Sequence, residues 1–193
     1  MQLLASAISR WLIRENRIVP EQQNLYAYAC ICAVLGVLPI LLALLWGIVF
    51  GSVLHSLILV LPIMLLRKFS GGFHFRSAWL CALTTAAVLG ALNWSIPFFA
   101  AHRLVANLLA LAAAILVICV SPIASPQKPL TQSEKTAFGK IARAVVVAML
   151  ALLLVLNLCA SSQSAVALAL GITLVGALQL PCIISNALHR GKK

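Results

Sequence analysis

Acidic residues are almost missing from this sequence. Its 193 residues include three glutamates, Glu15, Glu21 and Glu134, and no aspartate. Intramembrane aspartyl proteases need two aspartates, H-E-x-x-H zinc proteases need a glutamate between two histidines, and magnesium enzymes hold their metal with clustered carboxylates. The sequence also lacks the G-x-S-x-G motif of serine hydrolases and the G-x-x-x-x-G-K-S/T phosphate-binding loop. We therefore exclude these classes and expect neither a metal nor a cofactor.

Charged residues of both signs are scarce, and apolar residues dominate. Charged residues make up 9% of the chain and hydrophobic residues 63%, whereas a soluble domain is roughly 25% charged. A transmembrane helix needs about 20 mostly apolar residues. We predict an all-α integral membrane protein, one domain over 1–193, with six transmembrane helices paired as 25–66, 78–120 and 144–187. The second apolar run, 51–66, is short and contains Pro62, so we expect a kink there.

Basic residues are distributed unevenly among the connections. The chain has 14 lysines and arginines and a net charge of +11. All but Arg103 fall in the segments 1–22, 67–77, 121–143 and 188–193. Six alternating helices place these segments on one side, and cytoplasmic connections are rich in lysine and arginine. We therefore predict that both termini face the cytoplasm and that aromatic residues such as Trp46 and Trp94 lie at the outer interface. Because the basic residues follow the membrane topology, they do not indicate nucleic-acid binding.

Two connecting segments have structure of their own. In 1–22, Arg10, Arg14 and Arg17 share one face of a helix and apolar residues share the other. Such an amphipathic helix lies in the membrane interface, either as a surface anchor or as a receiving surface for a partner peptide. The first half of 121–143 contains three prolines, so we expect it to be extended, with a helix starting near Thr131 or Ser133.

Cysteine and histidine are the reactive side chains that remain. A cysteine inside an apolar run usually serves as a small buried hydrophobic residue. Five of the six cysteines fit this interpretation: Cys30, Cys32, Cys119, Cys159 and Cys182.

Cys81 differs, because it lies at the start of the third apolar run, seven residues after His74. Positive charge and a helix N-terminus both favour the thiolate, which is the nucleophilic form. Residues seven apart in one helix are separated by about 10.5 Å along its axis, so His74 must lie on a non-helical segment that folds back. Gly71 and Gly72 allow this bend, and their N–H groups are either part of a plain turn or donors to an oxyanion. The nearby basic residues are Arg67, Lys68 and Arg76.

Residues 67–81 resemble the signature of the accessory gene regulator B (AgrB) family of peptide-processing membrane proteases. The signature is a basic residue, then small-Gly-Gly-aromatic-His, a serine or threonine three residues later, and a cysteine seven after the histidine. Ser70 stands where alanine is common. The length, the spans, the amphipathic N-terminus and the proline-rich loop also agree. The matching residues are Arg67, Ser70, Gly71, Gly72, Phe73, His74, Ser77 and Cys81.

The resemblance implies a bacterial cell-membrane cysteine endopeptidase that acts at the cytoplasmic face. It implies that Cys81 is the nucleophile and His74 the general base, with Arg67 and Gly72 shaping the site. The substrate is expected to be a small propeptide with an amphipathic helix and an acidic tail. The product is expected to be a cyclic thiolactone or lactone precursor of a quorum-sensing signal, formed through a thioester on Cys81. Family resemblance also suggests a homodimer.

Several interpretations remain open at this stage. The basic residues of the cytoplasmic face either attract the acidic tail of the substrate or reflect topology alone; the candidates are Arg76, Lys128, Lys135 and Lys140. A small-peptide exporter or transporter is an alternative, because polar residues are scattered within the spans. They are few, we interpret them as unpaired, and no charged residue accompanies them, so we do not expect an ion-coupled pump. These residues are Asn93, Asn107, Asn157 and Gln179. A lipid-binding membrane module is the second alternative.

Overall fold

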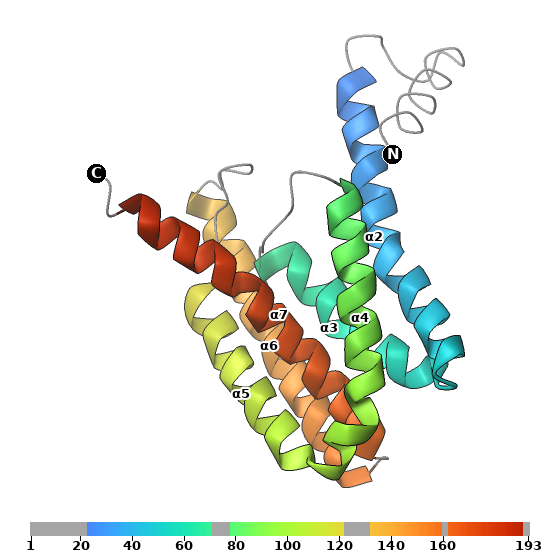
Figure 1. Ribbon diagram of the computed structural model, residues 1–193. Coiled ribbons are helices and arrows are strands. Elements are labelled where there is room, and N and C mark those ends of the chain that lie inside the picture. The colour runs from blue at the N-terminus through green and yellow to red at the C-terminus, as the bar shows by residue number, and fades with distance from the viewer. Residues whose placement is uncertain (1–22, 71–77, 122–131, 160–161, 191–193) are drawn as a thin grey trace.

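The computed structural model describes residues 23–70, 78–121, 132–159 and 162–190, and the regular structure in these ranges is helical throughout (Figure 1). Successive helices run in opposite directions along one bundle. We call the end at which α3 stops and α4 starts the Cys81 end, and the opposite end the Gly51 end. The helices are α2 (Gln23–Val49), α3 (Val53–Ser70), α4 (Ala78–Ala101), α5 (Arg103–Val120), α6 (Gln132–Cys159) and α7 (Ser162–Arg190).

Most of these helices are suited to a membrane. Two further apolar segments, Gly36–Val49 and Val53–Leu66, lie within the longer helices α2 and α3. The predicted all-helical membrane fold is thus confirmed, whereas the number of six crossings stays a prediction. Within the described residues, the four segments long and apolar enough to cross are Trp79–Ala101, Arg103–Val120, Thr136–Cys159 and Ser162–Ile184.

Two helices extend beyond the apolar runs that predict them. α3 continues past Leu66 through Arg67 to Ser70, into the connection expected at 67–77. α6 begins at Gln132 and therefore occupies the second half of the connection expected at 121–143. Hydropathy reports where a chain enters the apolar layer, whereas a helix continues until a residue such as glycine or proline interrupts it.

α7 lies at the centre of the bundle and contacts α3, α4, α5 and α6 (Figure 1). Residues 164–172 of this helix are all buried. Gly171 allows the close approach of α7 to α3, because a Cβ at this position would lie 2.3 Å from the carbonyl oxygen of Leu59. It would also lie 3.0 Å from Cγ of Pro62. The buried Pro62 thus marks the place where α3 crosses α7.

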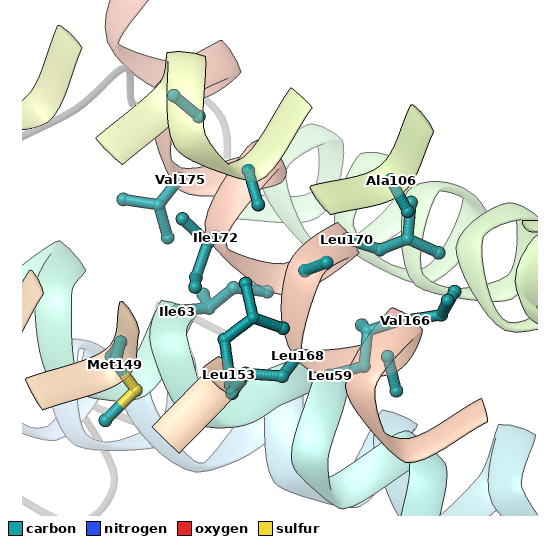
Figure 2. Packing of buried hydrophobic residues seen from close by; sticks show 14 of the residues in the cluster. Leu59, Ile63, Ala106, Met149, Leu153, Val166, Leu168, Leu170, Ile172 and Val175 are labelled. Carbon is teal, nitrogen blue, oxygen red and sulfur yellow. The ribbon is translucent and has the colours of Figure 1, made fainter. Parts of the chain in front are cut away.

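The apolar core forms where α3, α5 and α6 pack around α7 (Figure 2). Leu59 and Ile63 of α3 lie beside Leu168 and Ile172 of α7, and Leu153 of α6 completes the layer. Lipid tails are as apolar as these side chains, so close packing rather than transfer from water favours the association of helices in a membrane. This packing fixes α3 and α7 relative to each other.

Trp46 connects α2 to α4. Its indole N–H donates to the carbonyl oxygen of Ala86 at 3.0 Å, and its ring lies against Gly90. The indole N–H thus has a partner inside the bundle, and the place of Trp46 in an outer interfacial belt stays a prediction. Trp94, by contrast, is 75% exposed, as expected for a side chain that faces lipid.

The polar side chains inside the bundle pair with one another, which corrects the interpretation that they are unpaired. Asn107 of α5 and Asn157 of α6 exchange amide hydrogen bonds of 3.0 and 3.5 Å. The Ser56 hydroxyl of α3 donates to the side-chain oxygen of Asn93 in α4. An unpaired polar group in an apolar medium is costly, so helices bring such groups together. In a third pair, Nε2 of Gln179 donates to Oγ of Ser121 at 2.9 Å.

Candidate functional site

Cys81 is the fourth residue of α4 and lies in the first turn of that helix. Its exposed fraction is 9%, whereas the side chain of Trp79 is 65% exposed. The helix therefore turns the thiol toward the bundle and the neighbouring aromatic ring outward. The first turn of α4 contains no acidic residue, so no carboxylate there opposes the partial positive charge at the start of the helix.

Two threonines follow one turn later and bond back to this first turn. The Thr85 hydroxyl donates to the carbonyl oxygen of Cys81 at 2.7 Å. The Thr84 hydroxyl makes the same bond, also 2.7 Å long, to the carbonyl oxygen of Leu80. Thr85 is half-buried and Thr84 is exposed. Sequence reasoning missed both residues, although the Thr-Thr pair at i+3 and i+4 from Cys81 is visible in the sequence.

The remaining residues of the 67–81 signature are described only in part. Arg67 and Ser70 lie in the last turn of α3. The ends of α3 and α4 that border the signature lie at the same end of the bundle (Figure 1). The proximity of the predicted base to Cys81 therefore stays a prediction. The signature residues outside the described part of the chain are Gly71, Gly72, Phe73, His74, Arg76 and Ser77.

Basic side chains of α6 lie at the Cys81 end. Lys140 is exposed, and Nε of Arg143 donates to the carbonyl oxygen of Ile118 in the last turns of α5 at 3.4 Å. Lys135 belongs to the first turn of α6, and Lys128 lies outside the described residues. The predicted role of these lysines in binding substrate therefore stays a prediction.

The other described cysteines differ from Cys81 in burial. Cys119 and Cys159 are exposed and Cys182 is half-buried. The interpretation of Cys119 and Cys159 as buried residues is thus wrong within the described part of the chain, where both side chains are exposed. No group of three or more potential metal ligands occurs within the described residues. Cys30 and Cys32 belong to α2.

The strongly apolar helical bundle is typical of a membrane protein. The inward-facing thiol in the first turn of α4 is its candidate functional site. The family model of Accessory gene regulator B matches residues 5–182. The chain therefore belongs to this family, which confirms the resemblance found in residues 67–81. Membership fits a role in the accessory gene regulator system of quorum sensing.

One relative gives an independent comparison. The accessory gene regulator protein B of Staphylococcus lugdunensis is 32% identical over 84 residues. The match covers 44% of this chain and 45% of the relative, so it spans less than half of either protein. No solved structure matches the chain.

Proposed function

We propose that this protein is a membrane-embedded cysteine endopeptidase that cleaves a small signalling propeptide and cyclises it. The observation that carries the proposal is the position of Cys81. The residue that ends the family signature is a thiol on the inward face of α4, in the first turn of the helix. Membership in the Accessory gene regulator B family supplies the reaction class. The product is a thiolactone or lactone precursor of a quorum-sensing signal.

The proposed reaction has two acyl-transfer steps. In the first, Sγ of Cys81 attacks a peptide carbonyl, the C–N bond breaks, and the acidic tail leaves as an amine. His74 takes the thiol proton and gives it to the leaving nitrogen. In the second step, a thiol or hydroxyl inside the peptide attacks the thioester carbonyl and transfers its own proton to His74. Cys81 then leaves as a thiolate that recovers that proton, and the ring closes.

The signature residues around the pair have supporting roles in this proposal. We assign the N–H groups of Gly71 and Gly72 the role of donors to the oxyanion of the tetrahedral intermediate. Arg67 keeps positive charge near the thiolate. The chain has no aspartate to orient His74, so Ser70, Ser77 or a main-chain carbonyl serves in its place.

The proposed topology has six crossings, with both termini and the Cys81 end at the cytoplasmic face. Supporting it, the described helices alternate in direction, so the start of α2 and the end of α7 lie at the same end of the bundle (Figure 1). The positive-inside rule assigns this end to the cytoplasm, where a newly made propeptide arrives. The predicted interfacial helix 1–22 lies on this side.

The acidic tail of the substrate is proposed to contact basic residues at the Cys81 end. Lys140 supports this, because it is exposed on α6 near that end. Lys128, Lys135 and Arg76 are the further candidates. Such charges steer a substrate and raise its local concentration more than they strengthen tight binding, so neutralising them should raise KM and leave kcat close to its original value.

A non-enzymatic exporter is the alternative function, and the polar side chains scattered within the spans are the feature that favours it. In the described part of the bundle Asn107 and Asn157 bond to each other, and Asn93 accepts from Ser56. Paired amides between neighbouring helices are explained by helix association, and no transport path is needed to account for them.

Co-expression tests the proposal. Short propeptides encoded near the gene are expressed with the parent protein, Cys81→Ala or His74→Ala, and the products are measured by mass. Cys182→Ala is the matched control, since it removes a half-buried thiol of α7. We expect cleavage with the parent and the control and none with the other two variants. Cleavage that survives Cys81→Ala would overturn the assignment as a Cys81-dependent peptidase.

A further inference from the structure

Thr85 shares a helix face with Cys81. Residues four apart in an α-helix lie one above the other, so the inward face of α4 that carries Cys81 also carries Thr85, Leu89 and Asn93. Leu89 and Asn93 are buried and Thr85 is half-buried. The other inward positions between Cys81 and Asn93 are alanine, valine, leucine or glycine. Thr85 is thus the first inward-facing polar side chain that follows Cys81 along α4.

The hydroxyl of Thr85 is fixed to the backbone of Cys81. Helical side chains lean toward the helix N-terminus, and the 2.7 Å bond to the Cys81 carbonyl oxygen holds the Thr85 hydroxyl over the turn that carries the thiol. In an α-helix that carbonyl also accepts the backbone N–H four residues on, which is the N–H of Thr85 itself. A carbonyl shared in this way tilts, and the helix bends locally.

We propose that Thr85 is a positioning residue for Cys81. Its bond sets the tilt of the first turn of α4, and thereby the direction in which Sγ points. The inference rests on the proposed role of Cys81 as nucleophile and adds a residue outside the 67–81 signature.

The chain contains its own control. Thr84 makes a bond of the same type and length to the carbonyl of Leu80, whose side chain is exposed together with that of Thr84. Threonine and valine have nearly the same shape, so Thr85→Val and Thr84→Val each remove one hydroxyl and keep the volume. Thr85→Ser returns the hydroxyl at Cys81 without the methyl group.

The experiment measures the reaction of Cys81 with iodoacetamide in full-length protein in lipid nanodiscs. The other five cysteines are replaced by alanine, and each variant is checked for a single monodisperse species. We expect alkylation of Thr85→Val to be about three- to tenfold slower, the effect of losing one hydrogen bond. Thr84→Val should stay within about twofold of the parent, and Thr85→Ser should recover most of the rate. In peptide cleavage, Thr85→Val should lower kcat and leave KM unchanged.

Equal alkylation rates in Thr85→Val and the parent would overturn the inference. Equal slowing in Thr85→Val and Thr84→Val would also overturn it, because it would indicate a general bend of the helix. If Thr85→Val does not fold, Thr85→Ala and Thr85→Ser are compared in the same assay, and equal rates in this pair would also overturn it. Alkylation needs no substrate, so this result is independent of the proposed peptidase activity. Failure of that activity appears separately, as cleavage by Cys81→Ala.

Discussion

The indole ring of Trp46 occupies the space that a side chain at Gly90 would take. A Cβ on Gly90 would lie 2.9 Å from Cε2 and Cζ2 of that ring, closer than real Cβ contacts allow. The indole N–H bonds to the carbonyl oxygen of Ala86, one turn earlier on the same helix. This contact joins α2 to α4, the helix that carries Cys81, so it determines where the thiol lies in the bundle.

Gly90→Ala should therefore destabilise the protein by about 1–3 kcal/mol, the cost of an overpacked core site. Apparent melting temperature of the purified protein in detergent measures the effect. Gly36→Ala is the control, because nothing lies within 4 Å of a Cβ at that position of α2. If Gly90→Ala were as stable as Gly36→Ala, the packing described for Trp46 would be contradicted.

Gly171→Ala should destabilise the protein more than Gly90→Ala. The added Cβ would meet the backbone carbonyl oxygen of Leu59 at 2.3 Å, and a backbone atom in a packed helix cannot rotate away as a side chain can. We expect α3 and α7 to separate and the apparent melting temperature to fall furthest in this variant. The account would be wrong if Gly171→Ala proved as stable as Gly36→Ala.

The Asn107 and Asn157 amides should couple energetically. A double-mutant cycle with Asn107→Leu, Asn157→Leu and the double variant isolates their interaction. We expect a coupling of about 0.6 kcal/mol, the average for hydrogen bonds between membrane helices. The double variant should therefore be more stable than the sum of the single changes indicates. Strict additivity would mean that the reciprocal hydrogen bonds contribute nothing to the packing of α5 on α6.

Gln179→Leu should leave stability unchanged or raise it. Gln179 is fully buried, and within the described residues its Oε1 has no hydrogen-bond partner. Ser121 forms one hydrogen bond with the amide of Gln179. If the amide were rotated so that Oε1 and Nε2 changed places, Oε1 would accept that bond and Nε2 would be the atom without a partner. Removing an unsatisfied buried group recovers its desolvation cost of about 1–3 kcal/mol, against the loss of one hydrogen bond. A large fall in the melting temperature of Gln179→Leu would show that the amide of Gln179 stabilises the fold, contrary to this prediction.

Much of the fold could be predicted from the sequence because apolar runs and basic connections are local features. The helical class and the place of Cys81 in the first turn of a helix follow from them. The extension of α3 to Ser70 and of α6 back to Gln132 could not, since hydropathy marks the apolar layer and not the end of a helix.

The long-range contacts also could not be predicted from the sequence. Asn107 and Asn157 are 50 positions apart, and their pairing depends on the way α5 packs against α6. Tryptophan is common at membrane interfaces, so the sequence alone does not show that the ring of Trp46 packs against Gly90 of α4. At the site, the sequence singled out Cys81 through its signature, whereas the bond from Thr85 became visible only with side chains in place.

A covalent intermediate on Cys81 is the most direct test of the central claim. The purified protein is mixed with its propeptide, quenched with acid within the first turnover, digested and analysed by mass spectrometry. The account predicts that the peptide containing Cys81 carries the N-terminal fragment of the substrate as a thioester, which hydroxylamine removes. Cys81→Ala should give no such adduct. An adduct on a different cysteine, or cyclic product formed by Cys81→Ala, would contradict the account.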